Sequence, residues 1–174
     1  MNKIAIALSA ALSLGAMSSA NAADATINFT GKIEALTCGI TVGAGGSGTS
    51  VTMPTLSANV INSGVGSVRE QAFTLNVGAT GTKCAEGDYI FTFNGKNLEE
   101  GRLRNTATTG AASNVELAIL DGAKELDLRT DEITRSIDAS GITTIPLTAR
   151  YEKAAAGDAG NGAFATALEI FVQY

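Results

Sequence analysis

The hydrophobic positions of the chain recur mostly with a period of two, which is the pattern of β-strands that bury one face. The clearest example is the segment 23–33, in which apolar or small residues alternate with polar ones. This segment is therefore predicted to form a strand with one apolar face. The apolar face carries Ala25, Ile27, Phe29, Gly31 and Ile33.

Similar alternation continues along the chain, and clusters of Gly, Asn, Asp and Ser interrupt it about every 8–20 residues. No long amphipathic helical pattern accompanies it. Short strands separated by turns are typical of an all-β sandwich, which is the predicted fold class. The predicted strands are 35–42, 51–53, 72–77, 89–93, 114–121, 142–151 and 163–174, with a short return strand at Leu126 and Leu128.

Four segments are predicted to lie outside these strands. The glycine-rich segment 43–50 lacks the Lys-Ser/Thr pair and the helix of a phosphate-binding loop, so we interpret it as a connection. The segment 58–66 is consistent with a loop or with a single helical turn. The acidic stretches 98–100 and 131–132 are interpreted as polar turns.

The first 22 residues have the features of a secretory signal peptide. A positive start at Lys3 precedes an apolar run, and Ala20, Asn21 and Ala22 form a small-x-small cleavage signal. Cleavage is predicted after Ala22, with cleavage after Ala23 as the alternative. The apolar run is shorter than the ~20 residues that cross a bilayer, and no later segment is apolar enough, so no membrane span is predicted.

Removal of the leader leaves a mature chain of residues 23–174, which is long enough for one domain with its own core. The leader contains one of the 12 basic residues and none of the 17 acidic ones. The mature chain therefore keeps 11 basic and 17 acidic residues, a net charge of −6. This acidic balance argues against a nucleic-acid partner, which would require a basic surface.

Both cysteines, Cys38 and Cys84, lie in the exported part of the chain. Two cysteines in an oxidising compartment most simply form one disulfide. Such a bond would close a loop of about 46 residues, which the chain-entropy relation values at roughly 4 kcal/mol. A metal site is the weaker alternative, because two thiolates without histidine do not complete a tetrahedral shell.

The composition offers little support for enzymatic chemistry, and no cofactor is predicted. The chain has no histidine, which excludes Ser-His-Asp and Cys-His arrangements. The acidic residues are scattered through polar stretches, where surface charge explains them better than a carboxylate pair for glycoside hydrolysis. We therefore expect a protein that is not an enzyme.

The last predicted strand has an apolar alternation of its own, in which Leu168, Ile170, Val172 and Tyr174 share one face. Strands near chain termini fray unless another element holds them, and an apolar edge strand tends to pair with another molecule. A strand donated by one subunit can complete the sheet of the next. The two terminal strands together favour such an exchange.

Four segments resemble the chaperone–usher fimbrial subunits of the type 1 pilin family. Residues 27–33, followed by Cys38, resemble the start of these subunits, and 114–121 resembles their mid-chain strand. The segments 145–151 and 163–174 are similar to their C-terminal third. The resemblance covers essentially the whole mature chain and is closest to the major subunits.

This resemblance implies an incomplete immunoglobulin-like β-sandwich with an apolar groove, completed by a donor strand. It assigns residues 1–22 to the signal peptide, 23–33 to the donor extension and 34–174 to the pilin domain. A periplasmic chaperone would fill the groove first, contacting Leu168, Ile170, Val172 and Tyr174. At an outer-membrane usher, the extension of the next subunit would replace it. Its groove-facing residues would be Ala25, Ile27, Phe29, Gly31 and Ile33, with Gly31 at a shallow position.

The predicted function is therefore that of a structural subunit of a surface fimbria. Its partners would be identical or homologous pilins, the chaperone and the usher, and its route would lead through the periplasm to the cell surface. Two alternatives remain open from the sequence. One is a minor adaptor pilin with the same fold, and the other is a free secreted carbohydrate-binding β-sandwich.

Overall fold

The computed structural model describes residues 39–43, 50–79, 81–94 and 97–174. The chain divides into two compact units, Met1–Glu34 and Ala35–Tyr174, and all described residues belong to the second. The predicted donor strand lies outside the described residues, as does the first half of the strand predicted over 35–42. The second half of that strand is described, and residues 40–42 belong to a strand as predicted.

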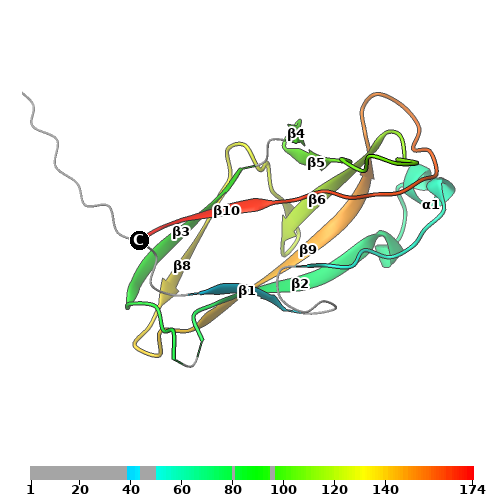
Figure 1. Ribbon diagram of the computed structural model, residues 1–174. Helices are drawn as coiled ribbons and strands as arrows, with labels where there is room; N and C mark the ends of the chain where they lie inside the picture. The colour runs from blue at the N-terminus through cyan, green and yellow to red at the C-terminus, as the bar shows by residue number, and fades with distance from the viewer. Residues whose placement is uncertain (1–38, 44–49, 80, 95–96) are drawn as a thin grey trace, which may run out of the picture. The chain divides into compact units, whose positions relative to one another are not determined.

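The described residues form mainly short β-strands, as predicted, with one short α-helix and one 3₁₀ turn (Figure 1). The α-helix α1 is Ala58–Ser63, which decides between the two alternatives for 58–66, and the 3₁₀ turn η1 is Ser67–Arg69. The strands are β1 (Ile40–Gly43), β2 (Glu70–Val77), β3 (Gly87–Asn94), β4 (Leu98–Glu99), β5 (Arg102–Arg104), β6 (Val115–Asp121), β7 (Lys124–Glu125), β8 (Glu132–Ile137), β9 (Thr143–Lys153) and β10 (Glu169–Gln173).

These strands are arranged in two antiparallel sheets. The larger sheet has the order β1-β2-β9-β6-β5-β4, with β7 paired to β6. The smaller sheet has the order β10-β3-β8. Residues from both sheets join one hydrophobic core, so the two sheets pack as a sandwich.

Alternation of buried and exposed residues confirms the main predicted strands. In β2, Phe73, Leu75 and Val77 are exposed by 6%, 1% and 0%, respectively, while their neighbours contact solvent. The inward residues of β3 and β9 follow the same pattern. Among the described strands, β6 is the one that is buried on both faces. The inward residues of these last three strands include Tyr89, Phe91, Phe93, Val115, Leu117, Ile119, Ile145, Leu147, Ala149 and Tyr151.

Several sequence predictions about individual elements are wrong. Residues 51–53 are not a strand, because they have no ladder partner among the described strands. Residues 98–100 and 131–132 are not simply polar turns, since Leu98–Glu99 is β4 and Glu132 begins β8. The return strand predicted at Leu126 and Leu128 is instead the two-residue strand β7, Lys124–Glu125. Leu126 and Leu128 follow β7 and are buried.

The strand predicted over 163–174 is shorter than expected, because β10 spans only Glu169–Gln173. The preceding residues have their own hydrogen bonds to the segment 105–112, through irregular contacts instead of a regular ladder. Residues 163–168 nevertheless lead directly into β10 without a reversal of the chain (Figure 1).

Candidate functional site

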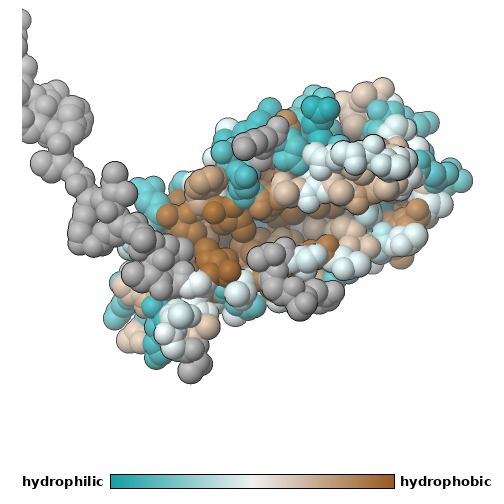
Figure 2. Space-filling view, viewed as in Figure 1, coloured by the Kyte–Doolittle hydropathy of each residue, from teal (hydrophilic) through white to brown (hydrophobic). Residues whose placement is uncertain are grey.

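The two sheets leave an open groove along one side of the sandwich. One edge strand of the larger sheet is β1, and one edge strand of the smaller sheet is β10. A cavity of about 520 Å³ contacts both strands, and Figure 2 shows apolar surface gathered in this hollow. We call this cavity the groove. It is lined by Val42, Val51, Thr52, Met53, Phe73, Leu75, Leu103, Leu117, Ile119, Ala149, Tyr151, Phe164, Ala165, Thr166, Ala167, Leu168 and Ile170.

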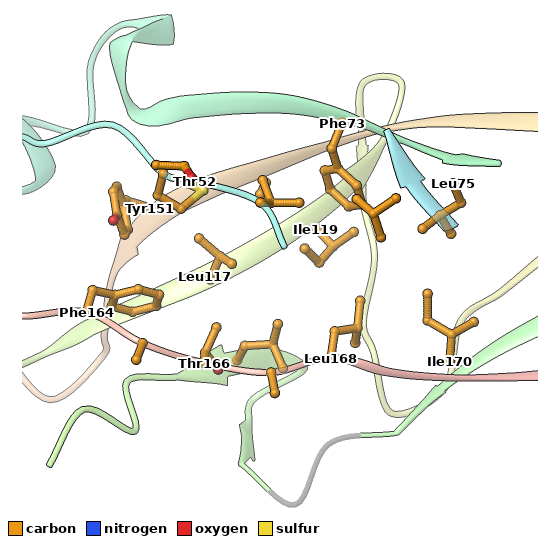
Figure 3. Close-up of a pocket in the computed structure, with 17 residues that line it drawn as sticks. Thr52, Phe73, Leu75, Leu117, Ile119, Tyr151, Phe164, Thr166, Leu168 and Ile170 are labelled. Carbon is orange, nitrogen blue, oxygen red and sulfur yellow. The ribbon is translucent and has the colours of Figure 1, made fainter. Parts of the chain in front are cut away.

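The floor of the groove is the inner face of the larger sheet. Phe73 and Leu75 come from β2, and Leu117 and Ile119 come from β6. Figure 3 shows these side chains facing the chain segment that contains β10. These residues alternate along their strands with residues of the opposite face, as the sequence predicted. Their role as a groove floor was not predicted, because it depends on which strands are neighbours in space.

One wall of the groove is formed by β10 and the extended residues before it. Phe164, Thr166, Leu168 and Ile170 line the groove and are half-buried, whereas the intervening residues are exposed (Figure 3). This alternation agrees with the face predicted for the last strand. The structure therefore brings Leu168 and Ile170 to the groove.

The other two residues of that predicted face lie beyond the lining. Val172 is half-buried and packs against the core. Tyr174 is 51% exposed, and its ring stacks on Tyr89 with centroids 5.5 Å apart. The apolar face thus extends past the groove toward the start of β3. Its contact with a chaperone stays a prediction.

The opposite wall is formed by Val42 of β1 and by the extended residues Val51, Thr52 and Met53. Beyond Met53 the hollow continues into a second cavity of about 370 Å³, which Leu56, Ala58 and Ile61 line near α1. The two cavities share Met53, Tyr151 and Phe164. The groove and this second cavity are therefore adjacent sections of one channel along the sandwich.

The groove is suited to an apolar occupant and offers little for acid–base chemistry. None of its 17 described lining residues is charged. Tyr151 is 8% exposed, its ring meets Phe164 edge-on at 5.1 Å, and burial raises the pKa of its hydroxyl. The ring therefore stays neutral at physiological pH.

A cluster of ionic contacts lies elsewhere, among charged side chains of the larger sheet. The Glu125 carboxylate accepts from Arg102 Nε at 2.6 Å and from Arg150 Nη2 at 2.7 Å. Neither these arginines nor Glu125 line the groove. Charge is thus kept out of the groove, which leaves dispersion, burial and backbone hydrogen bonding as the available binding forces.

The remaining predicted site residues are only partly described. Ala25, Ile27, Phe29, Gly31 and Ile33 lie outside the described residues, so their donor role stays a prediction. Cys84 is buried and disulfide-bonded. Its predicted partner, Cys38, also lies outside the described residues.

Two other kinds of site are absent from the described residues. No group of three or more acidic or cysteine side chains there is arranged to hold a metal ion. None of the helices in that part of the chain combines the length and the apolar character needed to cross a membrane.

A comparison with curated proteins identifies a fimbrial relative. Over 104 residues the chain is 38% identical to the major fimbrial subunit SMF-1 of Stenotrophomonas maltophilia. The match covers 58% of this chain and 59% of that protein. The chain therefore matches a little over half the length of this relative, and no family profile matches the chain.

Comparisons with solved structures identify the fold. The rod subunit PapA of the P pilus superposes with a TM-score of 0.58 at 16% identity, over 86% of this chain and 99% of that chain. A subunit of another chaperone–usher pilus gives 0.56 at 18% identity, over 86% and 94%. An antigen and type I fimbria protein of Burkholderia pseudomallei gives 0.52 at 20% identity, over 80% and 100%.

The fold is shared with pilus subunits of known structure. The predicted all-β, immunoglobulin-like fold is confirmed by the two sheets and by the pilus subunits that share them. The resemblance to the chaperone–usher fimbrial subunits is also confirmed, since the chain is homologous to a fimbrial major subunit. These relatives are structural subunits, in agreement with the expectation that the chain is not an enzyme.

Proposed function

We propose that the protein is a structural subunit of a surface fimbria that polymerises by donor-strand exchange. In this proposal, the segment 23–33 of one subunit occupies the groove of the next. The observation that carries the proposal is an uncharged, apolar groove between β1 and β10, each of which is an edge strand of its sheet in the described part of the chain. The apolar face of 25–33 has the complementary composition.

The same groove supports a role for a chaperone before assembly. An exposed apolar groove beside free edge strands is a site of aggregation unless another strand covers it. A periplasmic chaperone would cover it first, and an outer-membrane usher would exchange the chaperone for the next subunit. The signal peptide predicted over 1–22 is consistent with this route to the cell surface.

The gross energies expected for the exchange support a contact between subunits. Burial of the side chains of Ile27, Phe29 and Ile33 contributes about 1.5–3 kcal/mol each, or roughly 5–9 kcal/mol in gross terms. Backbone hydrogen bonds add about 0.5–1.5 kcal/mol each. The contact joins two different surfaces of identical subunits, so its repetition gives a filament and not a closed dimer.

The first prediction concerns Gly31. Gly31→Arg should abolish detergent-resistant multimers, because a long charged side chain would be forced against the uncharged groove. Deletion of 23–32 should have the same effect, because it removes most of the donor segment. An unboiled denaturing gel of surface material from cells that also express the cognate chaperone and usher measures this.

Wild-type protein run on the same gel is the reference. A ladder of multimers in the wild type, absent from both variants, is the expected result. If the wild type instead runs only as a monomer although the cognate chaperone and usher are present, the proposal is wrong. A free binding domain would then be the better interpretation.

A further inference from the structure

We propose that Asn105 is a positioning residue that lengthens the strand-accepting edge of the groove. This inference rests on the function proposed above. It concerns the extended residues immediately before β10, which the sequence analysis assigned to the last strand.

The need for such a device follows from length. The apolar face of the donor segment spans residues 25–33, whereas β10 has only five residues. An extended donor of this size covers about 30 Å at ~3.3 Å per residue, roughly twice the length of β10. Residues 164–168 and β10 together form a wall of ten residues, which matches the longer distance at the same rise per residue.

Residues 163–165 owe their extended path to the side chain of Asn105. Its Nδ2 donates to the carbonyl oxygens of Ala163 at 2.8 Å and Ala112 at 2.9 Å. Its Oδ1 accepts from the backbone N–H groups of Ala165 and Ala107, both at 3.0 Å. The carboxamide thus uses both of its donors and both of its acceptor positions, and two of the four bonds hold the groove wall.

Backbone bonds complete this attachment on the same side. The Ala163 N–H donates to Gly110 O at 2.7 Å, and the Ala163 carbonyl accepts from the Ala112 N–H at 2.9 Å. The Ala165 carbonyl accepts from the Thr106 N–H at 2.7 Å and from the Thr106 hydroxyl at 2.9 Å. The backbone N–H and C=O groups of Ala163 and Ala165 are therefore directed away from the groove.

In an extended chain, the backbone groups of successive residues point to opposite edges. The N–H and C=O groups of Phe164 and Thr166 are therefore directed to the open edge, beside the groove. No hydrogen bond to their backbone groups is found among the described residues. An incoming strand could bond to them as it bonds to β10, so the accepting edge runs continuously from Phe164 to Gln173.

The test uses the mature chain carrying Gly31→Arg as the acceptor, so that its own donor segment does not compete. The probe is a fluorescent peptide with the wild-type sequence of residues 23–33. Asn105→Ala should weaken its binding about tenfold, because several hydrogen bonds at the accepting edge are lost or misplaced. Thr106→Val removes only one hydroxyl bond at an exposed position and should weaken binding about twofold to threefold.

Asn62→Ala is the matched control. The Asn62 carboxamide also holds a distant backbone segment, because it donates to Ala159 O at 3.1 Å and accepts from the Ala159 N–H at 2.7 Å. It does not line the groove, so its removal should change peptide affinity less than about twofold. Hydrogen exchange gives a second readout. The peptide should protect the amides of Phe164, Thr166 and β10 in the parent chain, but only those of β10 in Asn105→Ala.

The outcomes separate this inference from the proposed function. If the parent chain does not bind the peptide, donor-strand exchange is wrong and the inference falls with it. If the parent binds and Asn105→Ala has the same affinity and protection, only the inference is wrong. Should Asn105→Ala fail to fold, unchanged affinity and protection in Thr106→Val would likewise overturn the inference.

Discussion

Ile170→Asp should abolish detergent-resistant multimers, whereas Phe171→Asp should leave them intact. The two residues are neighbours in β10 but occupy opposite faces of it. Ile170 lines the groove, and Phe171 is 53% exposed on the outer face. An aspartate at position 170 would remain hydrated while the groove is open, but a donor strand would bury it among uncharged side chains. Burial of an unpaired carboxylate costs several kcal/mol, which corresponds to a loss of affinity of about 10³-fold or more.

The pair of variants separates assembly from folding. Both place one aspartate in the same strand, so β-propensity and net charge change equally. Thermal melting followed by circular dichroism measures the stability of each monomer, which should fall more in Ile170→Asp because Ile170 packs against the core. The unboiled gel measures assembly separately. Multimers of normal stability in Ile170→Asp would show that the donor does not bury this face of β10. Equal loss in both variants would instead indicate a general requirement for an intact β10.

The strands that form the core could be predicted because their alternation is nearly uninterrupted. In β2 and β3, each inward position is aromatic or aliphatic and carries its own signal in the sequence. One strand, β8, was missed for the converse reason. Its alternate, inward positions are Ile133, Arg135 and Ile137, so a charged residue interrupts the apolar alternation. The guanidinium is accommodated by Asp121, whose carboxylate lies 3.0 Å away, and sequence alone does not reveal this partner.

The groove itself was only half predictable. The sequence indicated an apolar face on the C-terminal strand, because that signal is local. The floor joins residues from β2, β6 and β9, which are adjacent only after the larger sheet has formed. The start of β10 was misplaced for a related reason, since Asn105 holds Ala163 and Ala165 across about 60 residues of chain. Contacts of such sequence separation have no periodic signature.

Arg69→Met should lower the free energy of unfolding by about 3 kcal/mol, because it removes a buried cation from three acceptors. Arg69 is 6% exposed. Its Nη1 donates to Tyr151 O at 2.7 Å and to Glu152 Oε2 at 3.0 Å, and its Nη2 donates to Gly64 O at 2.8 Å. Methionine preserves much of the volume but leaves both carbonyls without this donor. For a domain of this size, the melting temperature should fall by about 6–12 °C.

Urea denaturation measures this effect best in a Gly31→Arg background, where binding between subunits adds nothing to the unfolding free energy. Arg104→Ala is the control, because its ion pair with Glu99 is as short, at 3.0 Å, but both side chains are more than half exposed. That change should cost less than about 1 kcal/mol. Equal effects of the two substitutions would mean that burial adds nothing to the Arg69 contacts. A larger effect at Arg69 would instead identify its bonds to Gly64 and Tyr151 as the link between the α1–η1 segment and β9.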